Sequence, residues 1–417
     1  MTTTSKGAFL YIYPAIVLKA LTQVRHNYFR KMSERMRLFH FAKLSMTVVC
    51  MWRLDRPPLS KFANLMYQLY SVVLRAILCS VPALMAVNFP SLLNSDPNSA
   101  IEGASKMLYC MILVVKAYSY QSNKCRDLLA KATEEESSLY DIDDDDVTRI
   151  YKEHVRFCHM LSKLFYISSI LSSSTLCAIA IVNSYKFSKI VDGVGEKPTP
   201  LLFWYPFDKN RYHIWVMVHQ FISILVASCY VLPNNVYYNS VMIYVRSRLR
   251  ILQHYFRNYP QYALSGRLTT LQMLNVLCVK HQDLINYIND VNCSVRDAVF
   301  FEYNVISVIL ATILYQVVQG QDTLFNSIFA FVVCIQLMIL AWTSDEIALQ
   351  SSSLGAALYE SKWFDQSQES KVLIGIMMMG CRKPLSISIG PFGPMTMLSA
   401  MSVCKKRNKC APMVFLS

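Results

Sequence analysis

The stretch from Leu324 to Thr343 reads LFNSIFAFVVCIQLMILAWT, twenty residues without one charged side chain. The hydrocarbon core of a bilayer is about 30 Å thick, and an α-helix crosses it in about 20 residues. Because no water reaches the middle of a bilayer, the backbone groups there must bond within the segment, as they do in a helix. The stretch therefore predicts a transmembrane helix and sets the class of the fold.

The composition of the whole chain agrees with a membrane protein. Hydrophobic residues make up 54% of the 417 residues, and charged residues make up 16%, against roughly 25% in a soluble domain. Mean hydropathy is +0.29. The 13 cysteines are scattered and form no CxxC pair. This composition disfavours a disordered chain, a nucleic-acid-binding domain and a secreted disulfide scaffold.

Six further apolar segments bring the number of predicted spans to seven. They lie at about 64–88, 100–118, 161–185, 212–237, 298–319 and 385–403. The last is the weakest, because Pro391, Gly393 and Pro394 interrupt its start. We predict an all-α membrane protein with seven transmembrane helices. Residues 246–256 and 268–291 carry apolar side chains at helical spacing, so long helices should continue outside the bilayer.

The basic residues of the loops predict the orientation, because Lys and Arg gather on the cytoplasmic side. The loops after the first and fifth spans have none. The loops after the second and fourth spans are rich in them: Lys124, Arg126, Lys131, Arg149, Lys152 and Arg156, then Arg246, Arg248, Arg250, Arg257, Arg267, Lys280 and Arg296. The loop 186–211 is the exception, with five basic residues on the predicted outer side. We expect a cytoplasmic N-terminus and an extracellular C-terminus.

Two charged features stand out in this pattern. Arg75 lies in the middle of the first span, where a charge costs about 2.5 to 3.5 kcal/mol, so it should face the bundle interior, a carboxylate or an aqueous cleft. The alternative is a span shifted in register, with the arginine reaching the interface. The acidic run 141–146 lacks the glycine and glutamate of a calcium loop, and we interpret it as a solvated loop.

Motifs for enzyme chemistry are missing from the sequence. There is no GxSxG, HExxH, phosphate-binding loop or kinase signature. No Cys/His ligand spacing occurs either. We therefore expect no enzyme, no cofactor and no metal site.

The C-terminal third carries the most specific pattern. It reads QSSSL at 350–354, ALYESKW at 357–363, KVL at 371–373, RKPL at 382–385 and IGPF at 389–392. This series resembles the insect odorant receptor family, whose members end in a helix with a Tyr/Glu/Ser/Trp pattern, a basic-Pro turn and a small-residue start to the last span. LFWYPFD at 202–208 and HQDLI at 281–285 are also similar to that family. The resemblance covers essentially the whole chain.

The resemblance implies an odorant receptor, the ligand-selective subunit of an odorant-gated cation channel. Such subunits form tetramers, usually with an obligate co-receptor subunit, in the plasma membrane of olfactory neuron dendrites. The implied regions are a cytoplasmic N-terminal segment (1–63), six transmembrane helices with a ligand pocket in their outer half (64–343), a cytoplasmic anchor helix (344–384) and a final pore-lining helix (385–417). The expected partners are a small volatile odorant, the co-receptor and membrane lipid, without nucleic acid.

Candidate site residues follow from the same resemblance. Tyr359 and Trp363, four apart on one helix face, would lie at the subunit interface, and Met397 and Ala400 would line the pore. A volatile ligand offers few hydrogen bonds, so its pocket should be mostly aromatic and aliphatic with one or two polar groups. Six residues in the outer halves of spans two to four fit this description: Tyr109, Ile179, Asn183, Trp215, His219 and Ile222.

The tail from Cys404 departs from the family pattern. Lys405, Lys406, Arg407 and Lys409 fall where the last span should stay apolar. We interpret this ending as non-native, since intron read-through would produce such a tail. Two other classes of protein stay open: a gustatory-type receptor channel, which shares the inverted topology, and a multi-span transporter, which would predict an inverted repeat.

Overall fold

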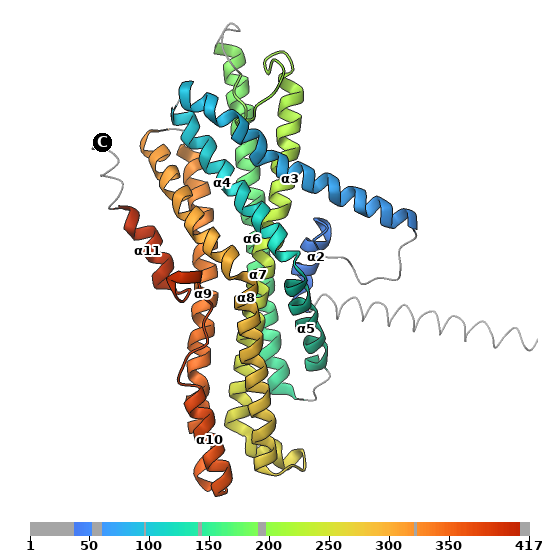
Figure 1. Cartoon of the computed structure of the whole chain (residues 1–417), viewed down its shortest axis with the longest axis vertical. Coiled ribbons are helices and arrows are strands. Elements are labelled where there is room, and N and C mark those ends of the chain that lie inside the picture. Colours follow the sequence, from blue (N-terminus) through green and yellow to red (C-terminus); the bar gives the residue numbers. More distant parts are fainter. Residues whose placement is uncertain are drawn as a thin grey trace, which may run out of the picture.

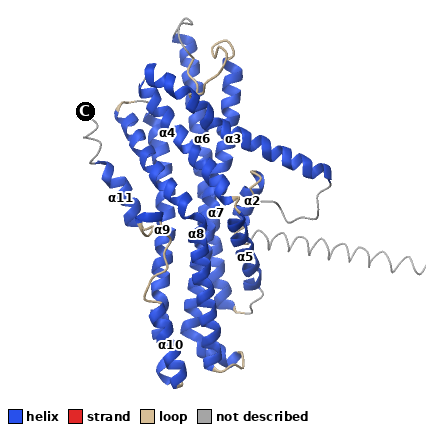
Figure 2. Cartoon of the chain, viewed as in Figure 1, coloured by secondary structure: helices blue, strands red, loops and turns tan. Residues whose placement is uncertain are grey.

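Figure 1 shows an elongated bundle of helices in this computed structural model. The structure describes residues 37–51, 61–95, 97–140, 144–190, 197–320 and 323–408. Over these residues the regular elements are α-helices and two short 3-10 helices, without a β-strand (Figure 2). The predicted all-α class is confirmed.

The helices follow the predicted spans but extend well beyond most of them. Their bounds are α2 His40–Val48, α3 Lys61–Ser95, α4 Pro97–Tyr120, α5 Asn123–Tyr140, α6 Asp145–Ile190, α7 His213–Ser265, α8 Thr270–Val318, α9 Thr323–Glu360, α10 Gln368–Gly380 and α11 Met397–Asn408. The 3-10 helices η1 and η2 span Trp363–Asp365 and Gly390–Phe392. Within the described residues, five helices are long and apolar enough to cross a membrane, namely α3, α6, α7, α8 and α9.

Helix α4 also spans 24 residues, but it carries Glu102, Lys106 and Lys116. The structure compensates these charges inside the bundle. Lys106 pairs with Glu102 one turn away, and Lys116 donates to Glu302 of α8 at 2.6 Å. Because each lysine has a carboxylate partner, the predicted second span keeps its helix despite its charges.

The last helix differs from its prediction. The apolar segment predicted at 385–403 is irregular up to Thr396, and α11 begins only at Met397. Gly390 and Gly393 adopt positive φ values of 52° and 89°, which favour glycine, and Pro391 and Pro394 cannot donate to a helix. Helix α11 is described up to Asn408, and residues 409–417 lie outside the described residues.

Below the spans, α7 and α8 continue as an antiparallel pair joined by a short turn. Thr269 starts α8 with a capping box: its hydroxyl accepts from the Gln272 amide at 3.2 Å, and its own amide donates to the Gln272 side chain at 2.9 Å. α9 packs against both helices. The Gln253 amide donates to the Gln350 carbonyl at 2.7 Å across the α7–α9 contact. The helices predicted outside the bilayer are therefore present and packed.

The acidic run lies partly outside the described residues, and Asp144 begins the part that is described. Its carboxylate caps α6 by accepting from the Asp146 and Val147 amides at 3.0 and 3.1 Å, and it also accepts from the Tyr262 hydroxyl. Burial alone would raise the pKa of Asp144, but these hydrogen bonds lower that pKa below its ordinary value. Asp144 is thus part of the structure rather than a freely solvated charge.

Most of the predicted N-terminal segment, residues 1–36 and 52–60, lies outside the described residues. The described part begins at Arg37, and α2 packs against α7. The Leu38 amide and the Tyr151 hydroxyl both donate to the buried Glu136 of α5, at 2.6 and 2.7 Å. Burial raises the pKa of the Glu136 carboxyl.

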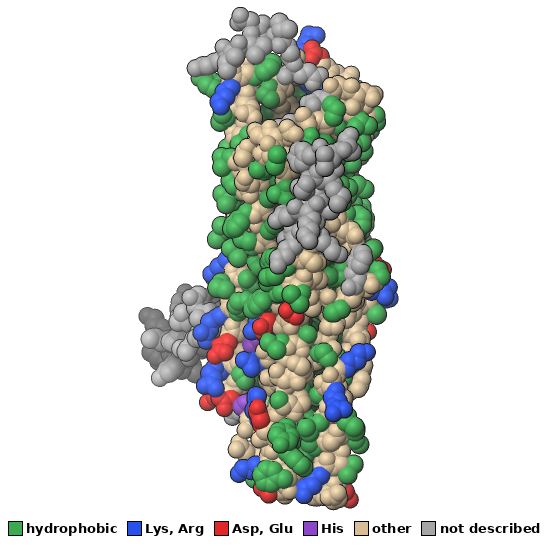
Figure 3. All heavy atoms as spheres, turned by 90° about the vertical axis from the view of Figure 1, so that its left-hand side faces the viewer, with side chains coloured by type: hydrophobic (Ala, Val, Ile, Leu, Met, Phe, Trp, Pro, Cys, Tyr) green, Lys and Arg blue, Asp and Glu red, His purple; other side chains and the backbone are tan. Residues whose placement is uncertain are grey.

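Charge divides the molecule along its long axis. On the face in Figure 3, the upper half is dominated by hydrophobic side chains, whereas Lys, Arg, Asp and Glu side chains gather over the lower half. The upper half has the surface expected against lipid, and the lower half the surface expected against water. The lower end contains the α7–α8 turn and α10 (Figure 1). Which of the two sides is cytoplasmic remains a prediction.

Candidate functional site

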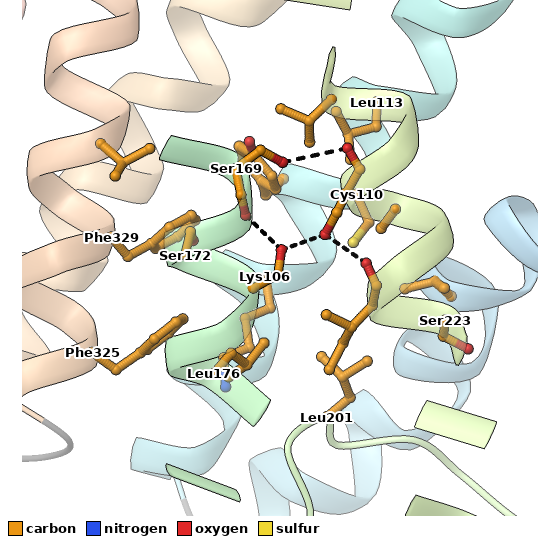
Figure 4. A pocket seen from close by; sticks show the side chains of 18 of the residues that line it. Lys106, Cys110, Leu113, Ser169, Ser172, Leu176, Leu201, Ser223, Phe325 and Phe329 are labelled. Carbon is orange, nitrogen blue, oxygen red and sulfur yellow. Dashed lines mark hydrogen bonds between the residues drawn. The ribbon is translucent and has the colours of Figure 1, made fainter. Parts of the chain in front are cut away.

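A cavity lies between α4, α6, α7 and α9, in the half of the bundle predicted to be the outer one (Figure 4). The volume open to the centre of a water-sized sphere is about 100 Å³. A single water needs about 10 to 15 Å³ on this measure, so the cavity has room for a small organic molecule. Val81 of α3 and Leu201 of the long outer loop complete its wall.

Aromatic rings form one side of this cavity. Phe325 and Phe329 lie one turn apart on α9 and are stacked, with centroids 5.6 Å apart and planes at 9°. Tyr109 of α4 meets Phe329 edge to face at 5.3 Å. In Figure 4 both phenylalanines project toward Ser172 and Leu176 of α6. Such a wall offers flat apolar surface and ring faces to a ligand.

Serines form the opposite side. The hydroxyls of Ser173 of α6 and Ser228 of α7 contact each other, and they lie 2.8 and 2.7 Å from a carbonyl of their own helices. One hydroxyl can donate to its carbonyl while the other donates to that hydroxyl. Their hydrogen bonding is therefore satisfied inside the protein. Ser172 and the side chain of Gln336 also line the cavity but hydrogen-bond to no described residue. These two groups can bond a ligand, as can Tyr109 of the same lining, whose hydroxyl also hydrogen-bonds to no described residue.

Lys106 is the charged residue of the cavity wall. Its ammonium group pairs with Glu102, donates to the Pro200 carbonyl at 3.3 Å and lies 5.6 Å from the centre of the Phe325 ring. The charge is thus neutralised at the wall and does not require an anionic ligand. The rest of the lining is apolar or hydroxylic.

The outer loop is held over the cavity by hydrogen bonds to three helices. The Leu201 amide donates to Gln220 of α7 at 2.9 Å, and Asn88 of α3 donates to the Leu202 carbonyl at 3.1 Å. Phe203 is buried in a cluster with Val81 and Ile224. The loop residues from 197 on therefore form a cap, and Leu201 is the described loop residue that reaches the cavity.

The structure brings one of the six predicted ligand residues into this cavity, Tyr109. His219 does not line the cavity; its ring nitrogen Nδ1 forms a hydrogen bond with the hydroxyl of the loop residue Tyr205 at 2.8 Å. Trp215 is 72% exposed and Ile222 is 47% exposed, so both face the lipid side of α7. Ile179 packs partly buried against the core, and Asn183 is half-buried near the outer end of α6.

Sequence reasoning missed the α9 phenylalanines and the serines of α6. A signal for the serines is visible: Ser169, Ser172 and Ser173 repeat at three-to-four spacing inside an apolar span, which places small polar groups on one helix face. Phe325 and Phe329 have the same spacing on α9.

Two further charged groups lie below the cavity. The Lys116–Glu302 pair joins α4 to α8, with side chains only 6% and 10% exposed. The second Glu302 oxygen is buried and has no hydrogen-bond partner among the described residues. Arg75 of α3 lines a separate polar hollow, which agrees with the prediction of an aqueous cleft.

Of the residues expected at the interface and pore, Tyr359 lies at the lower end of α9, Trp363 lies in η1, and Met397 and Ala400 lie in α11. The prediction that Tyr359 and Trp363 share one helix face is wrong, because α9 ends at Glu360 between them. Tyr359 is 64% exposed, and its ring lies 6.3 Å from that of Trp363. Ala400 is fully buried and Met397 packs against the core, on the side where α11 contacts α8 and α9.

Comparison with known proteins places this architecture in a family. The model of the 7tm Odorant receptor family matches residues 97–406. The chain belongs to this family. Odorant receptor 10 of Aedes albopictus is 20% identical over 236 residues, which are 54% of this chain and 62% of the mosquito protein. Odorant receptor 30a of Drosophila melanogaster is 21% identical over 272 residues, 64% of this chain and 69% of the fly protein.

Solved structures of the olfactory receptor OR5 from Machilis hrabei share the fold of this odorant receptor family member. The structure of OR5 alone gives a TM-score of 0.73 at 13% identity and covers 93% of this chain and 98% of its own. The complex of OR5 with eugenol gives a TM-score of 0.75 at 14% identity and covers 91% of this chain and 99% of its own. This likeness confirms the helical membrane architecture.

Proposed function

We propose that this chain is the ligand-selective subunit of an odorant-gated cation channel, assembled with a co-receptor subunit in the plasma membrane of olfactory neurons. The observation that carries the proposal is the capped cavity between α4, α6, α7 and α9, which is almost entirely apolar. Family membership and the solved complex of a similar receptor with eugenol support a small organic ligand.

The lining defines the class of ligand. Phe325, Phe329 and Tyr109 offer ring faces and edges to a flat or unsaturated hydrocarbon body. Ser172 and Gln336 offer one or two hydrogen bonds, enough to orient an alcohol, ester, ketone or phenol. Since Lys106 already has Glu102 as its partner, we infer a neutral ligand rather than a carboxylate.

The mechanism we propose is a population shift. The ligand binds one arrangement of the bundle better than the other, and it shifts the equilibrium by no more than that difference in affinity. α9 carries two of the cavity's rings and also contacts α11, where Met397 and Ala400 are our pore candidates. A small displacement of α9 would therefore reach the proposed pore helix directly.

Assembly with the co-receptor would use the lower end of the molecule. Tyr359 is an exposed aromatic residue at the end of α9, and such residues are enriched at protein interfaces. Trp363 follows it in the 3-10 helix η1. We propose that this pair contacts the neighbouring subunit, with the anchor helices in the cytoplasm.

Ligand-evoked current in cells that express this chain with and without a co-receptor subunit tests the proposal. We expect a cation current only when both subunits are present. Current from this chain alone would instead favour a gustatory-type receptor channel. Uptake of a substrate without current would favour a transporter.

A further inference from the structure

A second hollow lies between α3, the turn after α2 and the α4–α5 junction. Its volume for a water-sized sphere is about 480 Å³. Arg75 and Arg126 both line it, together with the side-chain amides of Gln68 and Gln121 and the Ser71 hydroxyl. Among the residues that the structure describes, no Asp or Glu lines the hollow.

The two arginines, Arg75 and Arg126, have no carboxylate partner within the described part of the chain. The Nε atom of Arg75 is buried and has no hydrogen-bond partner within the same part of the chain. A buried guanidinium nitrogen without an acceptor is costly, so this hollow is built to receive an anion.

The position of the hollow along the bundle shows where that anion comes from. Gln121 follows the last residue of α4 directly, so the hollow lies at the inner end of a span. Arg75 reaches this level although it is in the middle of its own span, because α3 is strongly tilted and diverges from the bundle above α2 and α5 (Figure 1). In the proposed orientation this level is that of the inner-leaflet headgroups.

The rim of the hollow is apolar on the side of α3. Val72 belongs to the lining, and Leu65, Leu69 and Val73 are exposed on the same helix. A soluble anion would leave this surface unused, whereas acyl chains would cover it. Arginine binds phosphate oxygens in a bidentate way, and basic pockets between transmembrane helices suit phospholipid headgroups.

We propose that Arg75 and Arg126 bind the phosphate group of an anionic phospholipid from the inner leaflet, with its acyl chains along α3. The chemistry recognised is a phosphate ester in a headgroup of net negative charge, since the choline cation of phosphatidylcholine would be repelled by the two arginines. The apolar rim selects the lipid over its soluble headgroup. The lipid would supply the anionic partner that Arg75 lacks among the described residues, and it would link α3 to the α4–α5 junction.

The test measures retention of phosphatidylserine by the purified full-length chain, using native mass spectrometry after exchange into vesicle lipid of mixed phosphatidylcholine and phosphatidylserine. We expect the wild-type chain to retain phosphatidylserine in preference to phosphatidylcholine. Arg75→Gln combined with Arg126→Gln should reduce this retention at least about tenfold, since it removes charge-assisted hydrogen bonds. Arg149→Gln, which removes an exposed charge elsewhere on the lower half, is the matched control and should retain the lipid.

Two further variants keep the test decisive. Arg126 is exposed, so Arg126→Gln alone should fold and should still lower retention severalfold. Arg75→Lys keeps the charge but loses the bidentate geometry and should give an intermediate value. Equal retention by the double variant and Arg149→Gln, or no preference over phosphatidylcholine, overturns the proposal. Competition by glycerophosphoserine as strong as that by the lipid also overturns it, because the occupant is then a soluble phosphate ester.

Discussion

The buried Lys116–Glu302 pair allows a quantitative prediction. The ammonium nitrogen lies 2.6 Å from one carboxylate oxygen, and both side chains are almost fully buried. Removing one partner leaves the other as an uncompensated charge, which costs about 3 to 5 kcal/mol in buried pairs. Replacing both partners by apolar residues of similar size removes the charge altogether and is often neutral or stabilising.

Single and double variants separate these cases. Unfolding entropy is about 2.1 cal/mol/K per residue, so for a chain of this length 3 to 5 kcal/mol corresponds to a fall in melting temperature of about 3 to 6 °C. We expect this fall for Lys116→Met and for Glu302→Leu alone. The double variant should melt close to the wild type, because the second substitution removes the stranded charge.

The assay is the fraction of monodisperse protein after heating in detergent, followed by fluorescence-detected size-exclusion chromatography. Asp297, which is exposed and pairs only with its neighbour Arg296, provides the control substitution Asp297→Asn, which should not shift the melting temperature. If the melting temperature of the double variant instead falls by the sum of the two single falls, the two charges do not interact, and the predicted compensation is wrong.

Three other predictions concern a helix cap, the proposed subunit interface and the orientation in the membrane. Asp144→Ala should cost about 1 kcal/mol through loss of the α6 cap. The pKa of Asp144 is lower in the folded protein than its ordinary value of 3.8. The stabilisation by its carboxylate is therefore fully present above pH 3.8 and is lost as the pH falls through the folded pKa. Equal losses of melting temperature at pH 7 and pH 2.5 would contradict this prediction. Tyr359→Ala should reduce co-purification with the co-receptor severalfold, whereas an unchanged yield would exclude Tyr359 from the interface. An epitope tag near Thr4 should be labelled only in permeabilised cells, and labelling of intact cells would reverse the proposed orientation.

The spans were predictable because bilayer crossing requires long apolar segments, and the uncharged run in α9 shows this directly. The facing of each helix was less predictable. In a soluble protein an amphipathic pattern marks the buried face of a helix. In a membrane protein both the buried and the lipid-facing sides are apolar, so hydropathy could not show that Trp215 and Ile222 face outward. Of the six residues predicted to contact the ligand, Tyr109 lines the cavity, and small hydroxyls such as Ser172 were the better guide to the inward face.

The starts of α8 and α11 differ in how far the sequence predicts them. The start of α8 could be predicted, since Thr269 and Gln272 form a capping box within four residues. The delayed start of α11 depends on Gly390, which faces the Phe300 side chain at 3.2 to 3.3 Å from an ideal Cβ position. That contact is between residues distant in sequence and is not visible in the sequence alone.

The central claim is that a neutral odorant binds in the cavity between α4, α6, α7 and α9. The most direct measurement compares Ser172→Leu with Ser174→Leu in the co-expressed channel, using the concentration of an activating odorant at half-maximal current. Ser172 lines the cavity, whereas Ser174, two residues on, is exposed on another face of α6. We expect that filling the cavity at Ser172 raises this concentration at least about tenfold or abolishes the current, and that Ser174→Leu leaves it unchanged. Equal responses of the two variants, or a loss confined to Ser174→Leu, would contradict this expectation.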